Sequence, residues 1–412
     1  MRAYLLAVGL LVLLCASVHG QGWSRFRGPD GQGIAEARLP KTFTEENVRW
    51  RVPAGVGHSS PVLWGDRLYL TRVGEGESPT RALVCFDATT GGERWAKSWP
   101  FESHGQHRLN SFASSTPAVD AAGVYLVWSS GEELRVRSVD HDGEERWDRT
   151  VGAFAAQHGS GASPVVIADR LVVANDHETE GSFLLGLDPA TGETHWKIER
   201  TTVRASYATP AVIRDEGGTP TLVFASTAHG ATAVDPISGE VVWETGPGFE
   251  QRFVATPGFV GRHLFLTAGS GSGGKECVVL ELPEPGQSGV PPIELYRPPR
   301  NLPYVPSVLG IDGRFYLFND GGIVSCLEAT SGDVLWRERI EGSFFSSPVS
   351  NREVVYIADR EGVLYSFAPS DEFELLGEFA LGATVFATPA IDRDSMYVRT
   401  ATELIRLGAP EE

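Results

Sequence analysis

The stretch Asp188-Pro-Ala-Thr-Gly-Glu-Thr-His-Trp196 carries the clearest structural signal, because it returns as Asp235-Pro-Ile-Ser-Gly-Glu-Val-Val-Trp243. The shared pattern is an acid, a turn with glycine, a second acid and then tryptophan. Glycine supplies the positive φ that such a turn needs, and the first acid can cap the backbone N–H groups of the turn. Further copies of the pattern are Asp87 to Trp95, Asp140 to Trp147 and Glu328 to Trp336. A unit repeated this often predicts one repeat architecture rather than two or three unrelated domains.

A second motif, a small polar residue followed by proline and β-forming residues, lies between the tryptophan motifs. The interval between successive prolines ranges from 41 residues (Pro348 to Pro389) to 56 residues (Pro61 to Pro117). The sixth copy is shifted by one residue, because the strand that follows it aligns better on Ser307. The eight copies are Ser60-Pro61, Thr116-Pro117, Ser163-Pro164, Thr209-Pro210, Thr256-Pro257, Val305-Pro306, Ser347-Pro348 and Thr388-Pro389.

Each repeat contains four short β-forming runs joined by turns. In the third repeat these runs are Ala162 to Ile167, Arg170 to Asn175, Ser182 to Asp188 and Glu193 to Glu199. Four strands in about 40–50 residues are typical of a propeller blade, and closed propellers have about 4–8 blades. The absence of sustained helical periodicity after the first 20 residues excludes a helical solenoid. We therefore predict an all-β fold, an eight-bladed β-propeller of four-stranded antiparallel blades.

The two ends of the repeat region predict how the ring closes. The last repeat, Ala387 to Leu407, ends after its third strand, so its outer strand has to come from elsewhere. The segment Asn47-Val-Arg-Trp-Arg51 has the character of an outer strand and precedes the first repeat. We predict that this N-terminal strand completes the last blade and removes an open sheet edge. The outer strands within the chain are expected at Trp95, Trp147, Trp196, Trp243, Leu295-Tyr296, Trp336 and Leu375 to Phe379.

The composition limits the possible partners. The chain of 412 residues has 53 acidic and 35 basic residues and a formal net charge of −18. This balance argues against nucleic acid or an anionic lipid surface as the main partner. With 42% hydrophobic residues, the chain can bury a large core, which excludes wholesale disorder. We expect a monomer without a membrane span.

The N-terminus has the pattern of an export signal. Arg2 is followed by an apolar run from Tyr4 to Ala16, which is shorter than the roughly 20 residues of a transmembrane helix. Val18-His-Gly20 fits a cleavage site, so we expect a mature chain in the periplasm or outside the cell. Lipidation of Cys15 is the alternative, but Leu14 is bulky for that processing site. The predicted organisation is a signal peptide at 1–20, a lead-in segment at 21–43, one propeller at 44–408 and a tail at 409–412.

The repeats resemble those of the PQQ-like (pyrroloquinoline-quinone-like) eight-bladed β-propellers. The resemblance rests on Asp188 to Trp196 and Asp235 to Trp243 and covers about residues 44–408. In addition, Gly22-Trp-Ser-Arg-Phe-Arg-Gly-Pro-Asp-Gly31 is similar to the N-terminal W-x-x-[WF]-R-G-P motif of secreted bacterial members. The family contains quinone-dependent dehydrogenases and a non-enzymatic outer-membrane assembly lipoprotein, so the resemblance implies a fold more strongly than an activity.

The dehydrogenases of that family carry an adjacent Cys-Cys disulfide over the cofactor and a calcium site of Glu, Asn and Asp. This sequence has no adjacent cysteines. Its three cysteines after the signal, Cys85, Cys277 and Cys326, belong to three different repeats. Because three is an odd number, at least one thiol is unpaired within the chain. We therefore expect no bound cofactor, with PQQ and calcium or another divalent metal as the alternative.

Most histidines fall in connections that open on one face of a propeller. His58, His104, His107 and His158 lie between the fourth and first strands of successive blades, and His177 and His229 between second and third strands. Long loops on a rigid scaffold often carry function. The predicted ligand-binding rim consists of His58, His104, His107, Asn110, His158, Asp176, His177, His229, Arg252, Asn301, Tyr304, Asp320, Asp359 and Arg360, with Phe344 and Phe345 as aromatic neighbours.

Three interpretations of this rim remain open at the level of sequence. His104, His107, His158 and Asp176 could hold Zn²⁺ or another divalent metal, since imidazole and carboxylate are suitable ligands. The rim could instead bind a partner protein or a polar small molecule such as a carbohydrate. The histidines could also be hydrophilic loop residues without a specific site.

The sequence contains no nucleophile elbow, zinc-protease motif or phosphate-binding glycine loop before a helix. It leaves open whether the chain is an enzyme and favours a non-catalytic role. We therefore expect a secreted scaffold for binding or protein assembly, whose working face is the histidine-rich rim. The alternative is an oxidoreductase or another metal- or quinone-dependent enzyme that uses the same rim.

Overall fold

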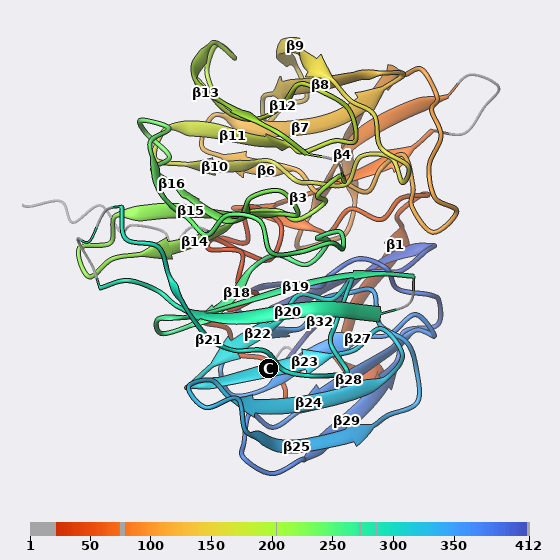
Figure 1. Ribbon diagram of the computed structural model, residues 1–412. Helices are drawn as coiled ribbons and strands as arrows, with labels where there is room; N and C mark the ends of the chain where they lie inside the picture. The colour runs from red at the N-terminus through yellow and green to blue at the C-terminus, as the bar shows by residue number, and fades with distance from the viewer. Residues whose placement is uncertain are drawn as a thin grey trace, which may run out of the picture.

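A computed structural model describes residues 22–74, 79–202, 204–271, 273–284, 287 and 289–409. The predicted signal peptide, including Cys15, lies outside the described residues. The chain forms eight four-stranded antiparallel sheets, which confirms the predicted eight-bladed propeller. Figure 1 shows the early blades, in orange to green, in the upper part of the view and the later blades, in green to blue, in the lower part.

We number the blades in chain order. Blade 1 consists of β2 (Val62–Trp64), β3 (Arg67–Val73), β4 (Thr80–Asp87) and β5 (Glu93–Pro100), and blade 2 of β6 (Ala118–Asp120), β7 (Gly123–Ser130), β8 (Glu133–Val139) and β9 (Glu145–Ala153). Blade 3 consists of β10 (Val165–Ile167), β11 (Arg170–Asn175), β12 (Ser182–Leu187) and β13 (Thr194–Arg200), and blade 4 of β14 (Ala211–Arg214), β15 (Pro220–Ser226), β16 (Gly230–Val234) and β17 (Val241–Glu244).

Blade 5 consists of β18 (Gly258–Val260), β19 (His263–Ser270), β20 (Gly273–Glu281) and β21 (Ile293–Tyr296), and blade 6 of β22 (Leu309–Ile311), β23 (Arg314–Phe318), β24 (Ile323–Glu328) and β25 (Val334–Arg339). Blade 7 consists of β26 (Val349–Ser350), β27 (Val355–Ala358), β28 (Val363–Phe367) and β29 (Leu375–Ala380). Blade 8 consists of β30 (Ala390–Asp392), β31 (Ser395–Arg399), β32 (Glu403–Gly408) and β1 (Val48–Pro53). A short 3₁₀ helix, Glu45–Asn47, precedes β1.

Strand β1 closes the ring, as predicted. It pairs antiparallel with β32, with Trp50 opposite Arg406 and Val52 opposite Leu404. In Figure 1 it lies beside the blue strands of the C-terminal end, although it comes from the start of the chain. The pairing gives blade 8 its fourth strand, so the predicted closure is confirmed.

The middle strands of each blade are buried on both faces because neighbouring blades cover them. All six residues of β12 are buried, whereas the outer strand β13 alternates between exposed and buried residues. The inner strands of neighbouring blades, such as β2 and β6, contact one another around the axis. The hydrophobic core therefore lies between the blades, with clusters that each combine residues of adjacent sheets.

The tryptophan motif joins neighbouring blades. Trp147 of blade 2 donates from Nε1 to the Pro189 carbonyl, and Trp196 of blade 3 donates to the Pro236 carbonyl, at 3.1 and 3.0 Å. Asp188 accepts the backbone N–H groups of Ala190 and Thr191, so it caps the turn as predicted. The repeated acid, glycine and tryptophan are thus architectural.

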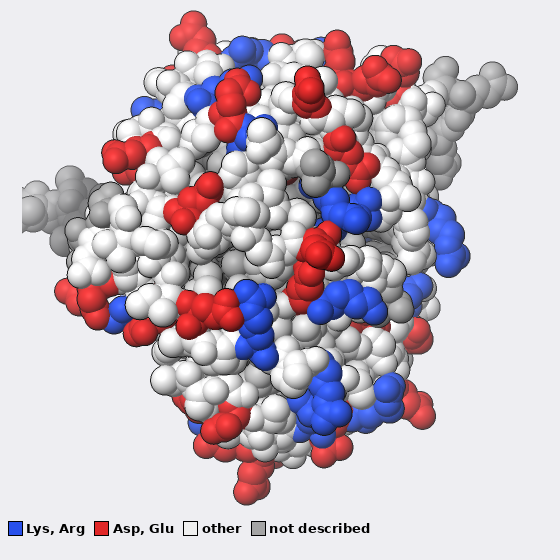
Figure 2. All heavy atoms as spheres, in the orientation of Figure 1, with Lys and Arg blue, Asp and Glu red and all other residues white. Residues whose placement is uncertain are grey.

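Cys85, Cys277 and Cys326 are all buried and unpaired. In the described part of the chain, no helix has the length and hydrophobicity that a membrane crossing needs. Figure 2 shows acidic and basic side chains interspersed over the displayed face, without a large area of a single sign.

Candidate functional site

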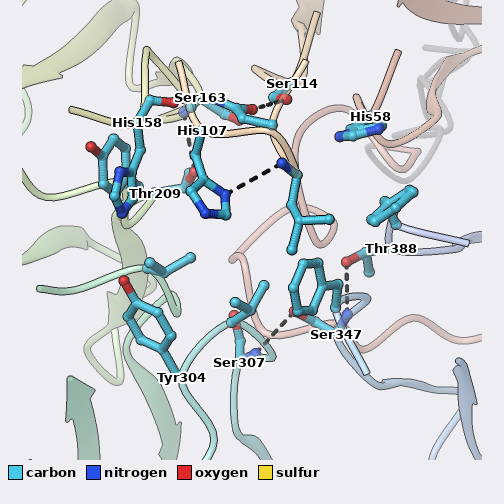
Figure 3. Close-up of a pocket in the computed structure, with 18 of the residues that line it drawn as sticks. His58, His107, Ser114, His158, Ser163, Thr209, Tyr304, Ser307, Ser347 and Thr388 are labelled. Carbon is cyan, nitrogen blue, oxygen red and sulfur yellow. Dashed lines mark hydrogen bonds between the residues drawn. The ribbon is translucent and has the colours of Figure 1, made fainter. Parts of the chain in front are cut away.

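The main candidate site is a funnel of about 300 Å³ at the axis of the propeller, drawn in Figure 3. Its lower wall is built by the Ser/Thr-Pro segments that precede the inner strands. Six residues of the predicted ligand-binding rim belong to its upper wall. The lining includes His58, His107, Asn110, His158, Arg252 and Tyr304 of that rim, together with Phe26, Leu109, Ser114, Tyr207, Phe345 and Phe386.

The Ser/Thr residues of the eight motifs form a ring of hydrogen bonds around the axis. At seven of the eight positions the backbone N–H donates to the hydroxyl oxygen of the equivalent residue in the next blade, at 2.9 to 3.2 Å. Figure 3 shows two of these bonds, from Ser307 to Ser347 and from Ser347 to Thr388. The donor–acceptor pairs are Ser60–Thr116, Thr116–Ser163, Ser163–Thr209, Thr256–Ser307, Ser307–Ser347, Ser347–Thr388 and Thr388–Ser60.

The sixth repeat is shifted, but by two residues instead of the predicted one, because Ser307 rather than Val305 takes the ring position. It also has one break, between blades 4 and 5. The Oγ1 atom of Thr256 is buried and has no hydrogen-bond partner among the described residues. Seven blade junctions are therefore joined by a hydroxyl at the axis, and the junction that follows Thr209 is not.

The segment from Trp23 to Gly33 forms the floor of the funnel. Its backbone bonds the inner strands of several blades: Leu63 donates to the Trp23 carbonyl, Val119 to Ser24 and Val212 to Asp30. Phe26, in the middle of the segment, lines the funnel. The lead-in segment is thus part of the propeller, and its W-x-x-[WF]-R-G-P-like sequence supplies this floor.

Imidazole and aromatic rings, two pairs of them stacked, form part of the funnel wall. His58 stacks on Phe386 with ring centroids 4.3 Å apart, and His158 lies parallel to Tyr207 at 6.0 Å. The rings of His107 and His158 are 5.1 Å apart and face one another across two loops (Figure 3). Arg360 lies over Phe345, 4.6 Å from its centroid, so it supports the wall through a cation–π contact.

Among the described residues that line the funnel there is no Asp or Glu, although the chain as a whole is acidic. Burial, helped by the charge of Arg399, lowers the pKa of His58 to about 4. Burial and the charge of Arg252 lower the pKa of His158 below its ordinary value. Arg252 itself is paired with Glu178 at 2.9 Å. At neutral pH these groups present a nearly uncharged wall that offers ring faces, imidazole nitrogens, hydroxyls and the Asn110 amide.

The other predicted rim residues have structural partners instead of lining the funnel. Asp176 is 4% exposed and pairs with Arg200 at 2.8 Å, and His177 is fully buried. His229 pairs with Glu244, and Asp320 accepts the backbone N–H groups of Tyr304 and Val305. Burial raises the pKa of Asp320 to about 6, and Asp359 accepts the backbone N–H of Val363. Asn301 has a left-handed backbone with φ of 59° and does not line the funnel.

The four residues considered as metal ligands do not share a site. His104 shares a hydrogen bond of 2.7 Å with the Ser129 hydroxyl, and Asp176 is held in its ion pair with Arg200. Only His107 and His158 approach one another. Across the described ranges, no three His, Cys, Asp or Glu side chains are grouped so that they could hold a metal ion.

The residues at the axis also do not fit a quinone and calcium as the dehydrogenases of the resembled family hold them. A calcium site needs several oxygen ligands, usually including carboxylates, and no described residue of the funnel lining has a carboxylate. Cys85 lies on β4, Cys277 on β20 and Cys326 on β24, so three separate blades carry the thiols. No pair of them can form the adjacent disulfide.

Sequence reasoning missed Tyr207, Phe386 and Phe26, as well as the role of the hydroxyls. The sequence did contain a pattern that pointed to the hydroxyls, because Ser or Thr precedes proline in seven of the eight motifs. Tyr207 and Phe386 had no such pattern, since each stands alone in its segment and reaches the funnel only through the closure of the ring. Phe26 stands in the W-x-x-[WF]-R-G-P-like motif, but nothing in that motif indicates that its side chain faces the axis.

Comparisons with known proteins agree with this architecture. BamB from Moraxella catarrhalis has a similar structure, with a TM-score of 0.61 and 14% identity over 88% of this chain and 99% of that chain. The quinohemoprotein alcohol dehydrogenase from Comamonas testosteroni gives a TM-score of 0.60 and 13% identity over 95% of this chain and 81% of that chain. At such identities these likenesses concern the fold alone. No curated protein sequence matches the chain.

A family model described as outer membrane protein assembly factor BamB matches residues 42–248, 306–373 and 320–407. These segments cover most of the eight blades and include the tryptophan motifs of blades 1 to 4 and 6. The chain therefore belongs to this family of PQQ-like repeat propellers.

Proposed function

We propose that the protein is a non-catalytic scaffold, exported to the cell envelope or beyond, that holds a segment of a partner protein in its axial funnel. The observation that carries this proposal is the funnel itself, a cavity whose lining includes the stacked ring pairs His58–Phe386 and His158–Tyr207. Such rings bind extended chain and side-chain surfaces by stacking, and the hydroxyls and Asn110 provide hydrogen bonds for a polar backbone.

The family description and the export signal support the same function. The family model is described as an assembly factor of outer-membrane proteins, and the BamB structure has the same fold. The predicted signal peptide would bring the chain to the compartment in which such assembly takes place. A propeller with rigid inter-blade contacts supplies a fixed surface for a partner without any chemical step.

The proposal is tested by site-specific photo-crosslinking in the cells that produce the protein. A photoreactive residue at Leu109, in the funnel, should capture a partner protein. The same residue at Ile237, which is 54% exposed on the turn before the outer strand β17, should not. Capture from Ile237 alone, or equally from both positions, would contradict the proposed site.

Two substitutions make this test specific. Phe386→Ala removes the ring on which His58 stacks and should weaken the crosslink from Leu109. Ile237→Ala removes an exposed side chain of the outer edge and should leave the crosslink unchanged. An unchanged crosslink in both variants would show that the aromatic wall does not hold the partner.

A further inference from the structure

The seven hydroxyls that accept a backbone N–H in the ring around the axis all line the funnel. Figure 3 shows five of their residues, which are 1% to 5% exposed, spread around the cavity: Ser163, Thr209, Ser307, Ser347 and Thr388. A hydroxyl that accepts an N–H still has its own hydrogen to donate. Among the described residues, none of the seven hydroxyls donates this hydrogen to a protein acceptor, and none bonds another hydroxyl of the ring. Seven hydrogen-bond donors without a protein acceptor therefore surround the lower part of the funnel.

Three buried arginines place positive charge beside this lower wall. Arg25, Arg27 and Arg399 are 2%, 0% and 1% exposed. Each donates to a backbone carbonyl of a residue adjacent in sequence to a ring residue, and these carbonyls belong to Pro210, Val308, Pro348 and Ser59. None of the three forms an ion pair with a described carboxylate, whereas the buried Arg200 pairs with Asp176. The charge next to the hydroxyls is therefore positive, and no described residue of the funnel lining is acidic.

These groups set the chemistry of a ligand at the lower wall. The hydroxyls need acceptors, and the nearby arginines favour a negative charge. A carbohydrate hydroxyl or a primary amide brings hydrogens of its own as well as acceptors, and it brings no charge. Water molecules can also accept from the hydroxyls, but they are equally uncharged. A carboxylate has two acceptor oxygens, donates nothing and forms hydrogen bonds roughly twice as strong as neutral ones.

The rings of the upper wall suit the remainder of such a ligand. Tyr207, Phe345 and Phe386 line the same funnel and offer apolar ring surface. An inorganic anion has no group that would contact these rings, whereas an organic molecule with a carboxylate at one end does. We propose that the ring hydroxyls bind the carboxylate group of an organic ligand, with the buried arginines stabilising its charge from outside the lining.

Two sources supply such a carboxylate, the C-terminus of a polypeptide and a free organic acid. The first source rests on the proposed scaffold function, because a partner segment would then enter the funnel with its C-terminus first. The carboxylate site itself does not rest on that function. The test therefore uses two probes, N-acetylglycyl-leucine for a chain terminus and isovalerate for a free acid, each compared with the corresponding amide.

Ligand-observed NMR titration of the mature chain measures the four affinities. Each acid should bind about tenfold more tightly than its amide, because only the acid carries the charge and accepts without donating. Equal affinities of acids and amides would overturn the carboxylate site. Tighter binding of N-acetylglycyl-leucine than of isovalerate supports the chain terminus as the source, and the reverse order overturns it in favour of a free acid.

Two matched pairs of variants locate the site. Thr116→Val removes one hydroxyl of the lining and should weaken acid binding about fivefold, because a hydrogen bond to a charged group is lost. Thr256→Val changes the equivalent position of blade 5, which is not among the residues that line the funnel, and should leave the affinity unchanged. Leu109→Asp adds a negative charge to the lining and should bind the acids about tenfold more weakly than Leu109→Asn, which has the same shape. Equal affinities within both pairs would overturn the proposal.

Failure of this proposal is distinct from failure of the proposed scaffold function. If neither acid binds while the photo-crosslink from Leu109 forms, the carboxylate site is overturned and the scaffold function stands. If isovalerate binds with the expected preference over its amide while no partner is captured, the carboxylate site stands and the scaffold function is overturned.

Discussion

At the scale of single residues, the inter-blade contacts depend on glycines that face tryptophan. Gly239 of blade 4 has a φ of 76°, and a Cβ at this position would lie 2.5 Å from Cγ of Trp196 in blade 3. Gly192 meets Trp147 and Gly143 meets Trp95 in the same way. The repeated glycine is therefore required for two reasons, the backbone conformation and the close approach of the ring.

These two reasons can be separated by a pair of substitutions. Gly239→Ala should lower the free energy of unfolding by about 1 kcal/mol for its positive φ and by a further 1–3 kcal/mol or so for the clash with Trp196. Gly246→Ala has nearly the same φ, 77°, but nothing lies within 4 Å of the added Cβ, so it should cost only the first amount. Denaturant unfolding of both variants measures the difference. Equal losses would show that Trp196 is free to move away.

At the scale of elements, strand β1 joins the two ends of the chain. It pairs with β32, and Asn47 just before it donates from Nδ2 to the Gly408 carbonyl at 3.1 Å. Arg51 on the strand donates to the Leu381 carbonyl of blade 7 at 2.9 Å. Without β1, the outer edge of β32 would be open and the ring would lose its fourth strand in blade 8.

Truncation separates the contribution of β1 from that of the funnel floor. A chain beginning at Lys41 loses the floor segment and keeps β1, and it should retain a cooperative thermal transition at a lower Tm. A chain beginning at Ala54 also loses β1 and should lose cooperative folding. Circular dichroism during heating compares both with the mature chain. Identical melting of the Ala54 and Lys41 chains would contradict the closing role of β1.

At the scale of the whole molecule, the hydroxyl ring couples the blades at the axis. Thr116 and Thr256 occupy equivalent positions and are both 2% exposed. The Thr116 hydroxyl accepts the Ser60 N–H at 2.9 Å, whereas the Thr256 hydroxyl has no described partner. The ring is therefore continuous on one side of the molecule and interrupted between blades 4 and 5.

The same substitution at these two positions should have different effects. Thr116→Val leaves the buried Ser60 N–H without an acceptor and should cost about 1–3 kcal/mol of unfolding free energy. Thr256→Val removes a buried hydroxyl that has no partner among the described residues, so it should change stability by less than about 0.5 kcal/mol, or raise it. Denaturant unfolding of the two variants provides the measurement. A large loss for Thr256→Val would contradict the interrupted ring.

The sequence predicted the fold to a large extent because its determinants are local and repeated. The predicted runs Arg170 to Asn175 and Ser182 to Asp188 coincide with β11 and β12 to within one residue. The outer strand containing Trp196 and the closing strand around Trp50 were also found. Each of these elements is recognisable from turn residues and alternation within a few positions, and eight copies reinforce one another.

The site could be predicted only in part. Loop position alone identified His58, His107 and His158 as residues of the funnel, because a loop that leaves an outer strand always opens on the same face. The same reasoning included Asp176 and His177, which are buried. Whether a loop side chain turns toward the axis or packs into its own blade depends on neighbours that are distant in sequence, such as Arg200 for Asp176.

The sequence by itself thus determined the eight-bladed ring, its closing strand and the structural use of the acid–glycine–tryptophan motif, because these depend on periodicity and short-range turn chemistry. Only the tertiary structure decided that Phe26 and the two arginines beside it close the axis, that the Ser/Thr hydroxyls form an interrupted ring, and that the funnel wall is aromatic and nearly uncharged. These features arise where eight blades meet, and each blade contributes only one or two residues. The physical reason is that contacts at the axis join residues hundreds of positions apart, as Arg27 and Pro348 show.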